Sequence, residues 1–225
     1  MAIIASDTFN VVLGTLGGLW TELGAPFGTN MSQDGASAVI DAVAWHMALA
    51  AGTSRSDHNL QCWMQSPNSS NNVGLFWRYI DSSNFYFLHC IPAQGVRLFR
   101  RAGAVNTLLD GPSGSFGSAT WHRIAVVHVG NRITVYIDQG YDTAFGREGP
   151  IIDFTDGSPV TGAGGCGITS TGNNATGANG PKWNDFCARD GEPDTIYVDL
   201  DFNGGFPGEG WGDAAEAEAV GQAGL

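Results

Sequence analysis

The chain has 225 residues, of which 43% are hydrophobic and 14% charged, so it can fold around a sizeable core of its own. The net charge of −12 and the lack of a basic stripe exclude binding to nucleic acid through a positively charged surface. No segment is apolar for long enough to cross a membrane, and the first ten residues, MAIIASDTFN, lack the basic start of a signal peptide. We therefore expect synthesis in a cytoplasm and no membrane partner.

Strand-like segments begin early in the chain, and the 33 glycines favour an all-β protein with many turns. Residues 38–52 permit two interpretations. Their alanines favour a helix, whereas their alternation and the all-β context favour a strand, which we prefer. Residues 59–65 follow as a strand.

Residues 73–90, VGLFWRYIDSSNFYFLHC, predict a hairpin of two aromatic-rich strands that turns at residues 81–84. If Ile80 faces Phe85 across the turn, one face of the hairpin is wholly uncharged and suits a core. The opposite face mixes large apolar groups with charge. It supplies three candidate ligand-binding residues, Arg78, Phe87 and His89, because aromatic faces and planar donors suit sugar rings. The alternative is that loops or a second copy of the protein cover this face.

Further strands are predicted at residues 95–103, 120–138 and 165–170. Within the second of these segments, Gly130-Asn131 forms a two-residue turn of type II′, which places Val129 opposite Arg132. The same register sets Arg123 opposite Asp138 as an exposed ion pair, worth roughly 0.2–1 kcal/mol.

Metal-binding and cofactor-binding signals are weak throughout the sequence. The four cysteines have no zinc-type spacing, so we expect reduced, buried thiols. His122 and His128 share a strand face but form no set of three or four ligands. Residues 199–210 resemble a calcium loop, yet Glu209 falls one position early. We predict no metal and no cofactor.

The end of the chain differs in charge from the rest. Residues 190–225 hold nine acidic groups and no Lys or Arg, whereas the rest of the chain has 13 acidic against 10 basic groups. A strand is predicted at residues 194–202, and Phe206 and Trp211 are candidate partner-binding residues. We divide the chain into a sandwich over residues 1–189 and an acidic, Gly-rich attachment arm over residues 190–225.

Several segments, taken in order, resemble the concanavalin A-like lectin/glucanase superfamily in its laminin G-like form. They are SDTFN, GTLGGLWTEL, VGLFWRYIDSSNFYFLHC, VRLFRRAG, TWHRIAVVHVGNRITVYID, AGGCGITS and KWNDFCA, spread over roughly residues 5–189. The resemblance implies a jelly-roll of two antiparallel sheets with adjacent first and last strands. It thereby implies that residues 7–9 lie beside residues 184–186, with Phe9 and Phe186 closing one edge of the core.

The resemblance does not extend to catalysis. The family's glucanases carry a Glu-x-Asp-x-(x)-Glu strand that supplies the nucleophile and the acid, and no such stretch occurs here. Before residue 190 the only glutamates are Glu22 and Glu148. We therefore predict that the protein is not an enzyme.

Two functions fit these features. The first is a structural accessory protein of a bacteriophage particle, on the capsid or tail, with other virion proteins as partners and self-association into a homo-oligomer. Cytoplasmic synthesis without a signal peptide and the acidic arm suit this setting. The alternative is a carbohydrate-binding module that recognises glycan through the Arg78, Phe87 and His89 face.

Overall fold

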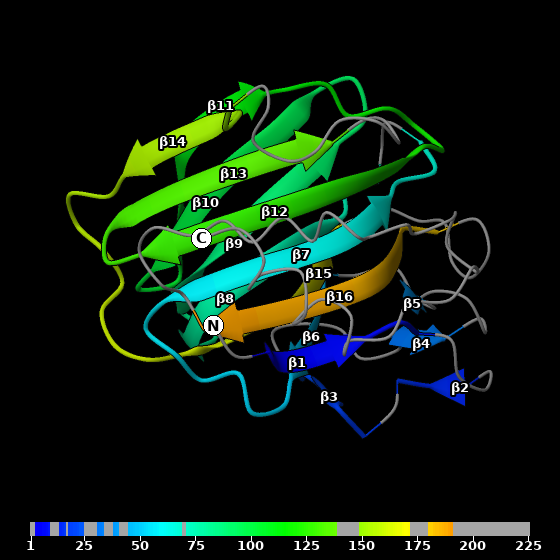
Figure 1. Ribbon diagram of the computed structural model, residues 1–225, viewed down its shortest axis with the longest axis horizontal. Helices are drawn as coiled ribbons and strands as arrows, with labels where there is room; N and C mark the ends of the chain where they lie inside the picture. Colours follow the sequence, from blue (N-terminus) through cyan, green and yellow to red (C-terminus); the bar gives the residue numbers. More distant parts are fainter. Residues whose placement is uncertain are drawn as a thin grey trace, which may run out of the picture.

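The computed structural model describes residues 3–9, 14–16, 18–24, 31–33, 38–40, 45–68, 71–138, 149–171 and 180–190 (Figure 1). The strand predicted at 194–202 and the residues Phe206 and Trp211 lie outside these residues, as does the attachment arm predicted at 190–225 except for Asp190, which ends the last described strand. No helix is present in the described part of the chain, so none of it forms an apolar helix of membrane-spanning length.

All regular structure in the described residues is β-strand, as predicted. The strands are β1 (Ile3–Asp7), β2 (Gly14–Thr15), β3 (Trp20–Glu22), β4 (Met31–Gln33), β5 (Ala38–Ile40), β6 (Trp45–Ala50), β7 (His58–Gln65), β8 (Gly74–Asp81), β9 (Asn84–Ile91), β10 (Gly95–Ala102), β11 (Val105–Ser113), β12 (Trp121–Val129), β13 (Arg132–Asp138), β14 (Ile152–Thr155), β15 (Gly165–Thr171) and β16 (Lys182–Asp190). The segment 38–52, for which a helix was the other interpretation, supplies strands β5 and β6.

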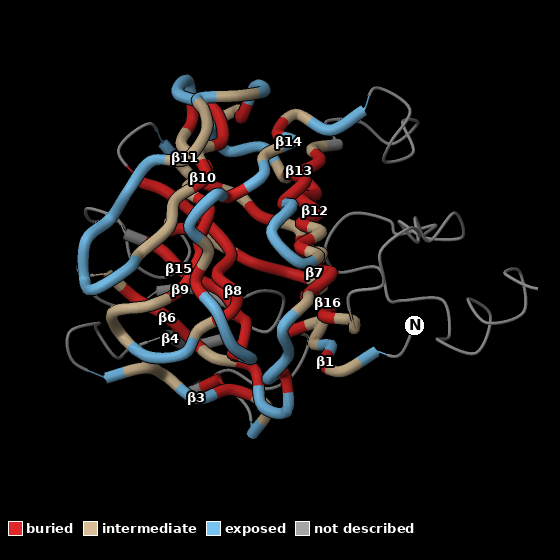
Figure 2. Tube along the Cα trace, turned by 90° about the vertical axis from the view of Figure 1, so that its left-hand side faces the viewer, coloured by how far each residue is buried: buried red, intermediate tan, exposed pale blue. Residues whose placement is uncertain are grey.

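The strands form two antiparallel sheets that face each other (Figures 1 and 2). A nine-stranded sheet has the order β14-β13-β12-β7-β16-β5-β4-β2, with β1 also paired to β16. A seven-stranded sheet has the order β11-β10-β9-β8-β15-β6-β3. This arrangement confirms the predicted two-sheet sandwich.

The core lies between the sheets, where alternate residues of each strand meet. Leu60, Ile124 and Val126 of the nine-stranded sheet and Leu75 and Leu88 of the seven-stranded sheet are all fully buried. Figure 2 shows the buried residues running along both sheets. The four cysteines are buried and free, as expected.

The first and last described strands are neighbours, as the resemblance implied. Strand β1 pairs with β16, with Asp7 opposite Phe186. Phe9 and Phe186 are fully buried, and the ring of Trp20 lies between them, with centroid distances of 5.4 Å to Phe9 and 5.0 Å to Phe186. This aromatic cluster closes one edge of the core.

The β12–β13 hairpin has the predicted register and turn. Val129 lies opposite Arg132, and Gly130 has a φ of 59°, as the first central residue of a type II′ turn requires. Arg123 lies opposite Asp138, but Arg123 is buried, so the prediction of an exposed pair was wrong for the arginine. The Asp138 side chain lies outside the described residues.

The β8–β9 hairpin turns within residues 81–84 as predicted, but its register differs from the prediction. Trp77 lies opposite Tyr86 instead of Leu88, and Asp81 lies opposite Asn84. A β-bulge between Trp77 and Asp81 accounts for the difference, because three residues of β8 there oppose the single residue Phe85 of β9. The shift is by two residues, so side chains before the bulge keep their predicted faces.

Candidate functional site

The outer face of the seven-stranded sheet carries a dense group of aromatic and cationic side chains, which we call the aromatic face. It is formed by residues that alternate with core residues along β6, β9 and β10, and by Phe76 and Tyr79 of β8, where the bulge after Trp77 brings Tyr79 to the same side as Phe76. Its members are Trp45, Met47, Leu49, Phe76, Tyr79, Phe85, Phe87, His89, Arg97, Phe99 and Arg101.

The aromatic face has two layers. Met47, Phe76, Phe85 and Phe87 are fully buried and form its base. Above and around them lie partly buried side chains, which are Trp45, Leu49, Tyr79, His89, Arg97, Phe99 and Arg101. The upper layer therefore presents aromatic surface on an apolar support.

Close ring contacts fix the upper layer against the base. Phe99 of β10 stacks on its cross-strand neighbour Phe87, with ring centroids 5.0 Å apart and planes at 6°. His89 contacts both rings, at centroid distances of 4.8 Å to Phe87 and 5.2 Å to Phe99. Such aromatic pairs each contribute about 0.5–1.5 kcal/mol beyond the burial of their area.

Trp45 is held in place from two sides. Its indole Nε1 donates a hydrogen bond to the Oγ1 of Thr169 on β15, at 2.9 Å. The guanidinium carbon of Arg101 lies 5.5 Å from its ring centroid, within the range of a cation–π interaction. The tryptophan is therefore pre-positioned before any ligand arrives.

A glycine in β15 lets the strands beside it pack closely under this face. A Cβ on Gly167 would lie 2.0 Å from the carbonyl oxygen of Ala48 and 3.0 Å from the ring of Phe76. Real Cβ atoms do not approach so closely. Any larger residue would therefore push β6 and Phe76 apart and disturb the base of the aromatic face.

His89 lies beside Arg97, its cross-strand neighbour on β10. Burial lowers the pKa of His89 to about 3, and the charge of Arg97 contributes in the same direction. His89 is consequently neutral at physiological pH, and Arg97 and Arg101 carry the charge of this face.

Of the three candidate ligand-binding residues, the structure places Phe87 and His89 on the aromatic face. Phe87 is fully buried beneath its neighbours, so it can support a ligand surface but cannot touch a ligand itself. His89 is partly exposed, so it can contact a ligand directly.

Arg78 is not on this face, so its predicted position was wrong. It sits at the bulge with a φ of 49°, and the guanidinium is directed into the interior. Its Nη1 donates to the carbonyl oxygen of Val160 at 3.0 Å, and its Nη2 donates to that of Gly130 at 3.0 Å. It also hydrogen-bonds the carbonyl oxygen of Ser56. Arg78 is therefore a structural residue that ties loops of both sheets together.

Other buried polar groups between the sheets also pair with each other. The Tyr86 hydroxyl donates to Asp156 Oδ2 at 2.7 Å and accepts from the backbone N–H of Val160 at 3.0 Å. The Asp156 carboxylate also accepts from Ser158 N and from Arg100, with which it forms an ion pair. Burial alone would raise the pKa of Asp156, but these hydrogen bonds outweigh it and hold the pKa below its usual range.

The described residues offer no cluster of three or more His, Cys, Asp or Glu side chains able to hold a metal ion. The side chains that define the aromatic face include no Asp or Glu. It can offer aromatic carbon, a neutral imidazole and two guanidinium groups, which suit non-covalent recognition of a ligand.

Sequence reasoning did not identify Phe99, Arg97, Arg101 or Trp45 as residues of this face. A signal for the first three was present in VRLFRRAG, because Val96 and Leu98 alternate with them and face the core. Trp45 gave no such signal, because apart from His46 the residues of its strand are apolar on both faces.

No protein-family model matches the sequence, and no curated protein does. Solved structures match it in shape. The carbohydrate-binding module CBM66 from Bacillus subtilis has a TM-score of 0.54 and 15% identity, over 77% of this chain and 92% of that one. At this level of identity the likeness shows a shared fold, the antiparallel two-sheet sandwich described above.

Other solved structures with this lectin-like fold include both binding proteins and enzymes. The exoplasmic/lumenal domain of VIP36, in a form bound to Ca²⁺ and Man3GlcNAc, has a TM-score of 0.59 and 12% identity, over 85% of this chain and 92% of that one. A xylan β-1,4-xylosidase from Bacillus halodurans has a TM-score of 0.58 and 14% identity, over 82% of this chain but only 39% of that one. The fold alone therefore does not tell a sugar-binding protein from a glycosidase.

Proposed function

We propose that this protein binds carbohydrate at the aromatic face. The observation that carries the proposal is the partly buried layer formed by Trp45, Tyr79, His89 and Phe99 over four fully buried apolar side chains. Sugar rings present C–H groups that pack on aromatic carbon, and their hydroxyls accept from or donate to polar groups at the rim. Carbohydrate-binding modules and lectins among the solved structures of this fold support the proposal.

The rigidity of the face also supports recognition. Phe99 is stacked on Phe87, and Trp45 is fixed by Thr169 and Arg101. Little side-chain entropy is then lost on binding, which favours affinity for a flexible polysaccharide.

We further propose that the protein acts without catalysis. Glycosidases need two carboxyl groups about 5–5.5 Å or about 6.5–9.5 Å apart across the scissile bond. The aromatic face as defined above contains none. Purified protein should therefore bind polysaccharide without releasing reducing sugar, and a turnover abolished by changing one carboxyl would contradict this.

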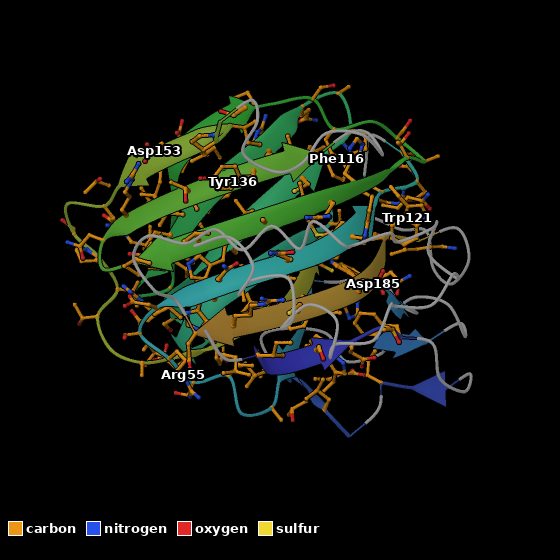
Figure 3. The ribbon with its side chains drawn as sticks, viewed as in Figure 1. Arg55, Phe116, Trp121, Tyr136, Asp153 and Asp185 are labelled. Carbon is orange, nitrogen blue, oxygen red and sulfur yellow. The ribbon has the colours of Figure 1, made fainter. Side chains whose placement is uncertain are left out.

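The binding experiment compares two tryptophans of similar burial on opposite sheets. Affinity electrophoresis against a panel of polysaccharides should show retardation of the unchanged protein. Trp45→Ala or Phe99→Ala should weaken the affinity at least about tenfold, because each removes ligand-facing aromatic surface. Trp121→Ala is the control, since Trp121 lies on the nine-stranded sheet (Figure 3). Equal losses from Trp45→Ala and Trp121→Ala, or binding to no polysaccharide, would contradict the proposal.

The setting in a phage particle is a separate proposal, and it rests on the sequence. Residues 190–225 concentrate nine acidic groups without one Lys or Arg, as an arm that docks on a basic partner surface would. Assembly of the protein lacking this segment onto particles without the full-length copy, read by sedimentation, tests it. Trp211→Ala should weaken attachment by about 1–2 kcal/mol if this residue anchors the arm. Undiminished occupancy by the truncated protein would contradict a role for the arm.

A further inference from the structure

We infer that the aromatic face selects glycans that carry carboxylate groups, such as polymers of uronic acids. This inference rests on the proposed carbohydrate binding and adds the class of sugar. It follows from the placement of two arginines, Arg97 and Arg101, on either side of Phe99.

The three residues alternate along β10 and point to the same side of the sheet. They lie opposite His89, Phe87 and Phe85 of β9 respectively. At about 3.3 Å per residue, the backbone positions of the two arginines are separated by about 13 Å. A sugar chain that contacts Phe99 therefore meets a guanidinium group in either direction along the strand.

Neither arginine is neutralised by a described residue. The ion pairs among the described residues involve Arg55, Arg78, Arg100 and Arg132. The side chains of the aromatic face include no carboxylate, although the protein as a whole has a net charge of −12. This face therefore carries positive charge on a protein whose net charge is negative.

Arg101 is held in a fixed orientation. Its Nε donates to the carbonyl oxygen of Ser82 at 2.8 Å, and its Nη1 donates to Asn106 Oδ1 at 2.8 Å. Its planar group also lies over the ring of Trp45. The nearest acidic residue of that turn, Asp81, uses its carboxylate to accept from Ser83 N and Asn84 Nδ2.

Arg97 is placed differently and complements Arg101. Its Nε is buried and has no hydrogen-bond partner among the described residues. The Arg97 side chain as a whole is only partly buried, so its terminal Nη groups can meet a ligand, and a carboxylate accepts from a guanidinium more strongly than a sugar hydroxyl does. The neighbouring imidazole of His89 is neutral, so it neither competes for the anion nor adds charge.

The apolar surface continues past Phe99 toward the edge of the sheet. Leu108 of β11 lies directly opposite Phe99 and is 48% exposed. A ligand on this face thus meets an apolar strip crossed by two cations, which matches a chain of sugar rings that bears regularly spaced carboxylates.

The test compares polygalacturonate with the same polymer after reduction of its carboxyl groups. The unchanged protein should bind the acidic polymer at least about tenfold more tightly, and the preference should shrink as salt is raised. Arg97→Gln and Arg101→Gln should each remove most of this preference and leave binding to the reduced polymer unaltered. Arg132→Gln is the matched control, because Arg132 is exposed on the other sheet.

The possible failures are distinguishable. Equal affinity for both polymers, with Phe99→Ala still weakening binding, would overturn the inference and leave carbohydrate binding standing. If the protein bound neither polymer and no other polysaccharide, both the selection of carboxylates and the proposed carbohydrate binding would be overturned. An equal loss from Arg132→Gln, or equal affinity for dextran sulfate, would show a general attraction of anions and would also overturn the selection of carboxylates.

Discussion

The indole Nε1–H of Trp77 donates a hydrogen bond to Nδ1 of His128 across the two sheets, at 2.8 Å. Both side chains are fully buried, and this bond requires that Nδ1 carry no proton. His58 lies directly opposite His128 on the neighbouring strand. Burial, together with the charge of Arg78, lowers the pKa of His128 to about 3 and that of His58 to about 4.

The first prediction is a loss of stability in mild acid. The native pKa values of His58 and His128 lie below the unfolded value of 6.5, so the unfolded state binds more protons. Their contribution is fully present above pH 6.5 and is lost as the pH falls toward 4 and then 3. Each histidine should lower the free energy of unfolding by up to about 1.4 kcal/mol per pH unit in this range. Urea denaturation between pH 7 and pH 5 measures it, above the range where carboxylates titrate.

The variant His128→Asn isolates one of these protons. An asparagine oxygen can accept from Trp77 but does not titrate, so the slope of stability against pH should become smaller by about one histidine's share. A slope identical to that of the unchanged protein would show that His128 is not the titrating group.

The second prediction concerns the Tyr86 hydroxyl. Tyr86→Phe leaves Asp156 Oδ2 without one donor and the buried N–H of Val160 without its acceptor. The free energy of unfolding should fall by about 1–3 kcal/mol. Tyr79→Phe removes a hydroxyl from a partly buried ring and should cost less than ~0.5 kcal/mol. Chemical denaturation of both variants compares them, and similar losses would contradict a special role for the Tyr86–Asp156 bond.

The third prediction uses two glycines in different surroundings. Gly167→Ala would bring a Cβ to 2.0 Å from the carbonyl oxygen of Ala48, so the strands must separate. We expect a loss of about 1–3 kcal/mol or more, seen as a lower Tm. Gly157→Ala is the control, because no atom lies within 4 Å of the added Cβ and φ is not positive there. It should leave the Tm unchanged or slightly higher, by about 0.4–1 kcal/mol of stability.

The sheets could be predicted from the sequence, and the site only in part. Alternation and turn residues located most strands, because side chains on a strand report directly which face is buried. The turn at Gly130 and the register of the β12–β13 hairpin were predicted from the residue pair Gly130-Asn131 alone. The outward positions of Phe87 and His89 followed in the same way.

The position of Arg78 could not be predicted, because a bulge changes the face of a residue without leaving a pattern in the sequence. The guanidinium of Arg78 at the bulge hydrogen-bonds carbonyl groups of Ser56, Gly130 and Val160, which come from distant segments and meet only in the folded chain. The role of Trp45 depends likewise on contacts with Thr169 and Arg101. Long-range contacts of this kind decide the composition of the site.

The central place of β16 has a consequence for how the chain is made. This last described strand pairs with β7 on one side and with β5 and β1 on the other, so it joins the two parts of the nine-stranded sheet. At 5–20 residues per second, synthesis reaches residue 190 only after about 10–40 s, and until then β1 has no described partner. The nine-stranded sheet can therefore close only after residues 182–190 have been made, and a ribosome stalled before Lys182 would hold a chain with open strand edges that invite aggregation.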